Sequence, residues 1–148
     1  MVSLPLFVYG TLRDDDVLAA VLCHAVDDKH VKSATALGYQ ALCYPGRTYP
    51  ALVASAGATA MGQLLGDLTA TDLARLDAFE GAEYQRVRIT VLVGTTPQLA
   101  LAYLPTIDIA DDSATWSLEY WRAHHKAAMM LDLTGAAGQD GLHRQMEL

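Results

Sequence analysis

Residues 68–91 of the chain read LTATDLARLDAFEGAEYQRVRITV and join a helical pattern to a strand pattern. Thr69 stands three residues before Asp72, a variant of the capping box that begins helices, and Gly81 is a residue type that commonly ends them. This spacing predicts a helix over residues 70–80. From Arg86 onward polar and apolar residues alternate, which predicts a half-buried strand whose inner face carries Val87, Ile89, Val91 and Val93.

Two carboxylates of this predicted helix fall on its apolar face, because Leu73, Leu76, Asp77 and Glu80 occupy positions i, i+3, i+4 and i+7. The negative pole of the helix dipole and partial burial both raise the pKa of a carboxyl at Glu80, as a general base for an amine requires. Ordinary interpretations stay open. In these interpretations the Glu80 side chain is only capped by neighbouring backbone groups or paired with Arg86. Asp77 is a structural acid that holds a strand or loop against the helix.

The stretch LFVYGTLR, residues 6–13, predicts an apolar strand over residues 4–9 that breaks into a short loop. One interpretation of the Tyr9–Leu12 loop is a plain turn, in which glycine supplies a positive φ. The other is that backbone N–H groups are left bare there to hold an anion. A helix follows, capped by Thr11 or Asp14. The three aspartates at 14–16 suit the positive end of its dipole, which predicts a solvated helix start rather than a metal site.

The remaining pattern is strand-rich. Glycine and proline punctuation separates strands predicted at residues 34–44, 51–55 and 60–67, and a turn at Gly94 joins residues 86–93 to a strand at 98–105. The stretch 113–133 predicts one amphipathic helix that buries Trp116, Tyr120, Ala123, Ala127 and Leu131. The sequence therefore predicts an α+β class, with a curled or barrel-like sheet and flanking helices in one domain over residues 1–134, and a loosely held tail over 135–148.

Composition excludes several classes of partner. The chain has 148 residues, 52% of them hydrophobic, so it can bury a core, and its net charge of −7 and pI near 5.0 argue against binding nucleic acid. The first ten residues lack a signal-peptide pattern, and no run of about 20 apolar residues could cross a bilayer, so we expect no membrane partner and a cytoplasmic location. Cys23 and Cys43 lack metal-site or disulfide spacing and are predicted to be free, buried thiols. We expect no metal, including at His124 and His125, whose side chains point about 100° apart on a helix.

Four stretches carry a resemblance to a known family. VYGTLR at 8–13, YPALV at 49–53, GQLLGDLTATDLARLDAFEG at 62–81 and EYQRVRITV at 83–91 together resemble the gamma-glutamylcyclotransferase-like family, over about residues 6–103. The YGTL segment alone is a weak motif, whereas YGTL followed by the LDxFEGxxYxR pattern is fairly specific. The resemblance implies a small mixed β-barrel of about five to six strands with helices around it.

The resemblance also implies a reaction and a set of site residues. The loop of Tyr9, Gly10, Thr11 and Leu12 would bind a gamma-glutamyl moiety, and Glu80 would act as general acid and base, closing that moiety to 5-oxoproline and releasing an amine, amino acid or peptide. No metal or cofactor is implied. Tyr84 and Arg86 match the YxR positions and are predicted at the substrate site, Arg86 by fixing Glu80 or Asp77; Tyr103 and Tyr120 are further candidates for the pocket wall. The alternative is a domain of the same fold that binds a small metabolite or a protein without catalysis.

Overall fold

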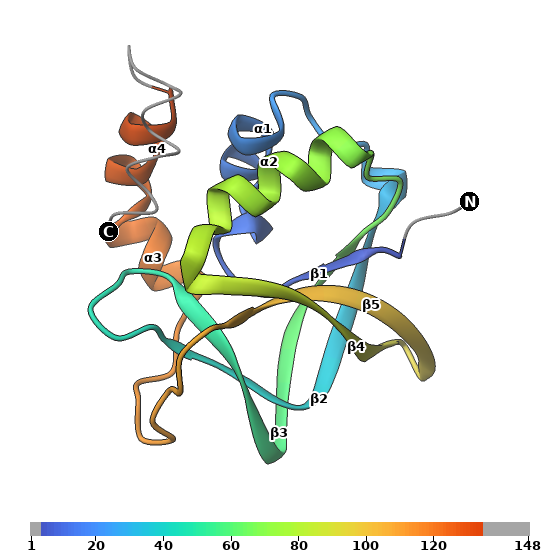
Figure 1. The fold of residues 1–148 in the computed structure, drawn as a ribbon, viewed down its shortest axis with the longest axis vertical. Helices are drawn as coiled ribbons and strands as arrows, with labels where there is room; N and C mark the ends of the chain where they lie inside the picture. The colour runs from blue at the N-terminus through green and yellow to red at the C-terminus, as the bar shows by residue number, and fades with distance from the viewer. Residues whose placement is uncertain (1–3, 135–148) are drawn as a thin grey trace.

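The computed structural model describes residues 4–134, and within them five strands close into a ring. The strands are β1 (Leu6–Val8), β2 (Val31–Cys43), β3 (Pro50–Leu65), β4 (Tyr84–Val93) and β5 (Thr96–Pro105). Their order around this closed barrel is β1-β3-β2-β4-β5, and every neighbouring pair is antiparallel except β1 with β5. The predicted α+β class with a small mixed barrel is confirmed (Figure 1).

The prediction of two separate strands between residues 51 and 67 is wrong, because the structure has one long bent strand, β3, in this region. Gly57 in β3 has φ 81° and Gly38 in β2 has φ 79°, and the pairing register of the two strands shifts between Leu37 and Tyr39. Only glycine adopts such φ values at little cost, so the strands turn a corner here without ending. A glycine inside a strand pattern marks a bend or bulge as readily as a turn.

Four α-helices gather at one side of the barrel: α1 (Asp15–Leu22), α2 (Ala70–Glu80), α3 (Leu118–His124) and α4 (Lys126–Thr134) (Figure 1). Helix α2 has the predicted bounds, and its capping box is complete. Asp72 N–H donates to Thr69 Oγ1 at 3.0 Å, and Thr69 N–H donates to an Asp72 carboxylate oxygen at 3.0 Å. Gly81, at φ 66°, ends the helix as predicted.

The prediction of a single amphipathic helix over residues 113–133 is also wrong. The chain breaks at His125, which has φ −129° and ends α3, so no single stripe runs through both helices. Tyr120 and Leu131 of the predicted stripe are 59% and 73% exposed. The side chains that α3 and α4 bury are instead Trp121, Met129 and Leu133.

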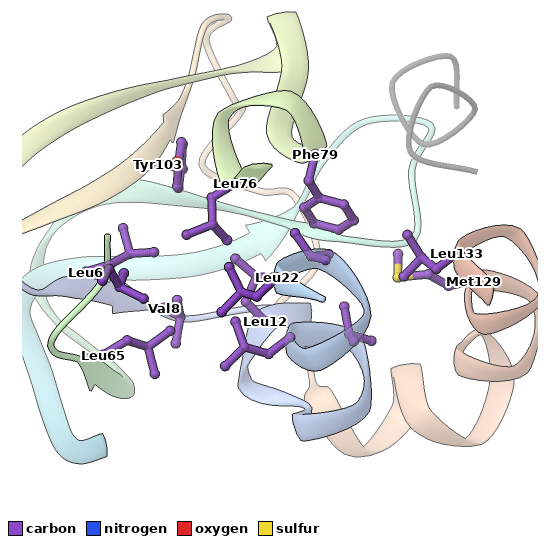
Figure 2. Close-up of a cluster of buried hydrophobic side chains, with 14 of the residues drawn as sticks. Leu6, Val8, Leu12, Leu22, Leu65, Leu76, Phe79, Tyr103, Met129 and Leu133 are labelled. Carbon is purple, nitrogen blue, oxygen red and sulfur yellow. The ribbon is translucent and has the colours of Figure 1, made fainter. Parts of the chain in front are cut away.

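One apolar cluster lies between the helices and the barrel. In Figure 2, Leu76 and Phe79 project from α2 toward Leu12 and Leu22, while Met129 and Leu133 approach from α4. A second cluster fills the barrel interior and includes Tyr9. The connection between β1 and α1 therefore runs from one core to the other, which holds the Tyr9–Leu12 loop firmly.

Asp14 is the N-cap of α1, which decides between the two predicted caps. Its Oδ1 accepts the N–H groups of Asp16 at 3.0 Å and Val17 at 3.2 Å. The predicted solvated start is wrong for this residue, since Asp14 is only 2% exposed and its Oδ2 lies 2.8 Å from Arg122 Nε and 3.0 Å from Lys126 Nζ. Burial alone would raise the pKa of Asp14, but the hydrogen bonds from the two basic residues outweigh it and leave that pKa below its ordinary value.

The cysteines, the C-terminal tail and the helices can also be compared with the sequence predictions. Both cysteines are free, but the predicted burial is wrong for Cys23, which ends α1 in a left-handed conformation with its side chain exposed; Cys43 is partly buried. The predicted tail at residues 135–148 lies outside the described residues. Among the helices of residues 4–134, none combines the length and apolar character needed to cross a membrane.

Candidate active site

A pocket of about 480 Å³, counted out to its open mouth, lies where the end of β1, the start of β3 and the end of α2 meet. Its wall is made largely by aromatic and loop residues together with two carboxylates. The lining residues are Phe7, Val8, Tyr9, Gly10, Thr11, Leu12, Tyr49, Pro50, Phe79, Glu80, Glu83, Tyr84 and Tyr103.

The loop after β1 passes close to the start of β3, and this contact explains its glycine. Gly10 has φ −126°, so the expectation that it supplies a positive φ is wrong. A Cβ at this position would instead lie 2.7 Å from Cγ of Pro50, closer than side-chain atoms approach one another. Glycine is therefore required by packing against a proline ring, which has little freedom to move.

The amide groups of this loop are available to a ligand. The 3₁₀ turn η1 (Thr11–Arg13) closes with hydrogen bonds from Arg13 N–H to Gly10 O and from Asp14 N–H to Thr11 O, each 3.0 Å long. Within residues 4–134, the N–H groups of Gly10, Thr11 and Leu12 donate to no protein acceptor. Successive free N–H groups in a turn suit an anion such as a carboxylate.

Glu80 stands at the last position of α2 and lines the pocket while partly buried. In the part of the chain that the structure describes, its carboxyl group has no hydrogen-bond donor and no cation as partner. Burial, followed by the negative charges of Glu83 and Asp77, raises the pKa of Glu80 to about 8. A carboxyl with this pKa can accept and return a proton near neutral pH.

Three tyrosines of the pocket wall are held by hydrogen bonds that they donate. Tyr9 OH donates to the carbonyl of Tyr103 at 2.6 Å, and Tyr84 OH donates to the carbonyl of Pro50 at 2.5 Å. Tyr103 OH donates to Asp77 Oδ1 at 2.6 Å. Burial is the main cause that raises the pKa of all three phenols, so they stay protonated donors and form a rigid wall.

Asp77 lies behind this wall and connects α2 to two strands. It accepts from Tyr103 of β5, and its Oδ2 lies 3.4 Å from Arg86 Nη1 of β4. This is the structural role predicted for Asp77. Its predicted position on the buried face is wrong, because the side chain is 48% exposed and the face centres on Leu76 and Phe79. Arg86 pairs with Asp77 rather than with Glu80, and it is not among the lining residues.

Glu83 is the second carboxylate of the pocket. Its Oε1 accepts from Tyr49 OH, and its Oε2 accepts from Arg47 Nε at 2.9 Å. The carbonyl of Glu83 accepts from Tyr44 OH at 3.4 Å. The side chain is therefore fixed from two directions, in contrast to Glu80.

The structure brings most of the predicted site residues into this one pocket: Tyr9, Gly10, Thr11, Leu12, Glu80 and Tyr84, with Tyr103 from the further candidates. Tyr120 lies elsewhere, 59% exposed and stacked on His124. Sequence reasoning gave no role to Tyr49, Pro50 and Glu83. The YPALV and EYQRVRITV stretches contain all three, so the resemblance offered a signal for them. No cluster of three or more metal-ligating side chains is found within residues 4–134.

The geometry suits a ligand that carries both an anionic and a cationic end. The loop with the free amide groups and two acidic side chains, Glu80 and Glu83, line the same pocket, and no Lys, Arg or His is among the described lining residues. Such a site can hold a carboxylate at the amides and an ammonium at the carboxylates. Glu80 can then exchange a proton with the bound group.

These features define a small-barrel domain with an amide-lined, carboxylate-bearing pocket. The model of a family described as "Gamma-glutamyl cyclotransferase, AIG2-like" matches residues 6–123, and the chain belongs to this family. AIG2-like protein A of Arabidopsis thaliana is 33% identical over 123 residues, which span 81% of this chain and 73% of that protein.

Solved structures share the fold of this chain. The solution structure of an Arabidopsis thaliana protein has a TM-score of 0.65 and 30% identity, with 85% of each chain covered. A structure entitled "Gamma-glutamyl cyclotransferase" has a TM-score of 0.62 and 15% identity, covering 96% of this chain and 85% of that one. The second likeness shows that the two proteins share a fold.

Proposed function

We propose that this protein converts a gamma-glutamyl compound into 5-oxoproline and releases the amine, amino acid or peptide attached to the γ-carbonyl. One observation carries the proposal: the unpartnered carboxyl group of Glu80 lines the same pocket as the free amides of the Tyr9–Leu12 loop. Membership of the gamma-glutamyl cyclotransferase, AIG2-like family supports this class of reaction. We propose further that it acts in the cytoplasm on a small-molecule substrate, without a nucleic-acid or membrane partner.

In this proposal the gamma-glutamyl group binds through its α-carbon substituents. The α-carboxylate accepts hydrogen bonds from the N–H groups of Gly10, Thr11 and Leu12, and the α-ammonium lies at Glu80. Tyr84 walls the pocket, with its hydroxyl bound to the carbonyl of Pro50. Arg86 acts indirectly, by holding Asp77 where Tyr103 donates to it.

The chemistry then needs one proton carrier. Glu80 takes a proton from the α-ammonium, and the freed amine attacks the γ-carbonyl to form the ring C–N bond. Glu80 returns this proton to the leaving nitrogen as the C–N bond to the distal amine breaks. Glu80 then accepts the second proton, which the ring nitrogen sheds as it becomes a neutral amide, and passes it to the released amine or to water, so that the carboxylate is restored. Attack within one molecule has a high effective molarity once the chain is held folded, so the proposal requires no metal ion or cofactor.

The test is incubation of the purified protein with a panel of gamma-glutamyl amines, amino acids and peptides, with and without a chelator, while 5-oxoproline is followed by mass spectrometry. We expect 5-oxoproline from at least one compound in both conditions, and none above background with Glu80→Gln. Binding of a panel member without any product would instead support a non-catalytic binding domain and refute the proposal. Equal turnover by Glu80→Gln would refute the assignment of the base.

A further inference from the structure

Glu83 adds a second carboxylate to a pocket whose proposed chemistry uses only one. We propose that Glu83 binds the α-ammonium group of the substrate beside Glu80, and so makes a free α-amino group a requirement for binding. This inference rests on the proposed function, because it assigns a substrate contact within the same site.

The fixed position of Glu83 is the first support. Tyr49 OH donates to one carboxylate oxygen, and Arg47 Nε donates to the other at 2.9 Å. The side chain of Glu83 is 17% exposed, so it is held largely out of bulk water. A carboxylate that is already oriented loses little side-chain entropy when a ligand binds to it.

The second support is the unused hydrogen-bonding capacity of this carboxylate. An ionised carboxylate offers about four acceptor sites, and Tyr49 and Arg47 occupy two of them. An ammonium group has three N–H donors, and within the described pocket wall the acidic side chains that can receive them are Glu80 and Glu83. The guanidinium of Arg47 is 30% exposed and is not a lining residue, so water screens part of its charge.

The third support is the electrostatic state of the empty pocket. Two acidic side chains line one pocket with no basic side chain among the described lining residues. Burial first, and then repulsion from the charge of Glu83, raises the pKa of Glu80. An ammonium placed between them relieves this repulsion and gains a charge-assisted hydrogen bond to each.

The two carboxylates then have different tasks. Glu83 is bonded on both oxygens and stays in place, whereas Glu80 has no partner among residues 4–134 and is free to move with the proton. Ring closure turns the ammonium nitrogen into a neutral amide nitrogen, so 5-oxoproline loses the charge that Glu83 holds. The contact is strong for the substrate and weak for the product, which favours product release.

The test compares two ligands that differ only in the α-ammonium group: gamma-glutamylpropylamide and N-propylglutaramate, which has hydrogen at that carbon. Calorimetry is carried out on Glu80→Gln, which prevents turnover and leaves Glu83 as the acidic partner of the ammonium. We expect this variant to prefer the amino ligand, and Glu80→Gln/Glu83→Gln to lose about tenfold or more of that preference, as a lost charge-assisted hydrogen bond implies. Glu80→Gln/Glu119→Gln removes the same charge from an exposed position of α3 and should keep the preference.

The possible results separate the two proposals. Equal weakening of both ligands, or an unchanged preference, would overturn the role of Glu83 and leave the cyclotransferase proposal standing if the wild-type protein forms 5-oxoproline. Failure of either ligand to bind, together with no turnover of the panel, would overturn both. If the double variant does not fold, Glu83→Asp in the Glu80→Gln background keeps the charge but withdraws the carboxylate by one methylene group. We expect part of the preference to be lost there, and retention of the full preference would overturn the inference.

Discussion

Replacing Glu80 with glutamine should abolish activity and at the same time stabilise the fold. In the folded protein the pKa of Glu80 is raised to about 8 from its ordinary value of 4.5, chiefly because the carboxyl is buried without a partner. The unfolded chain releases this proton near pH 4.5, whereas the native state keeps it until about pH 8. Stability is therefore fully present below pH 4.5, falls as the pH rises, and reaches its lowest value above pH 8.

The magnitude follows from the size of the shift. Each pH unit between the two pKa values costs about 1.4 kcal/mol, which amounts to about 3 kcal/mol at pH 7 and about 5 kcal/mol above pH 8. These are upper bounds, because part of the Glu80 side chain still meets solvent. Glutamine has nearly the same shape and cannot ionise, so Glu80→Gln should remove this cost and raise the melting temperature at pH 7 by roughly 6 to 12 °C at most.

The assay is thermal or urea unfolding of wild type and Glu80→Gln at pH 4, 7 and 8.5, with turnover measured on the same samples. The stability difference should be near zero at pH 4 and grow with pH, while activity falls on the order of 10²-fold or more for a lost general base. Glu119→Gln, an exposed control, should show no such trend. A Glu80→Gln variant that is less stable at every pH would refute the reasoning, since it would mean that the wild-type carboxylate has a stabilising partner.

Three further outcomes are expected. The kcat/KM of the wild type should rise with pH through a single ionisation near pH 8. The pH profile of kcat should have its midpoint at a lower pH, because the bound ammonium stabilises the Glu80 carboxylate. Identical midpoints in the two profiles would argue against this contact. Gly10→Ala should weaken the binding of gamma-glutamylpropylamide measured by calorimetry, because the added Cβ would press on Pro50. Gly66→Ala, whose Cβ would have 3.6 Å of clearance, should leave binding unchanged. Equal effects of the two substitutions would indicate that the loop is a turn and does not bind the ligand. Asp14→Ala should lower the free energy of unfolding by about 1 to 3 kcal/mol at pH 7, since it removes a helix cap and leaves Arg122 without its carboxylate partner, whereas Lys126 keeps its ion pair with Asp16. Because the pKa of Asp14 is depressed, this difference in stability should shrink as the pH falls through that pKa. Urea unfolding of both proteins at a series of acidic pH values measures it, and a difference that stays constant with pH would contradict the prediction.

Local rules were sufficient wherever the deciding residues lie within a few positions of one another. The bounds of α2 follow from Thr69, Asp72 and Gly81, whose capping interactions span three or four residues. The alternation in β4 identified Ile89 and Val91 as buried. The position of Glu80 at the end of an amphipathic helix was enough to make it a candidate base.

Local rules failed where a glycine or a helix break had two possible meanings. Gly57 reads as punctuation in the sequence, and only pairing with β2 shows that it bends a continuous strand. The break at His125 has no strong local signal, so the buried face of α3 and α4 could not be read from spacing. The sequence singled out Gly10 for a positive φ, but the structure shows that glycine is required there because a side chain would collide with the ring of Pro50.

The sequence alone thus determined helix α2, the alternating strand β4 and Glu80 as a candidate base, since these depend on contacts between near neighbours. Only the tertiary structure decided the composition of the pocket, because it forms where β1, β3 and α2 meet around a closed ring of strands. Tyr49 and Glu83 are 34 residues apart and share a hydrogen bond, and Tyr9 reaches a carbonyl 94 residues away. Such contacts depend on how the barrel closes, and no short-range pattern records that closure.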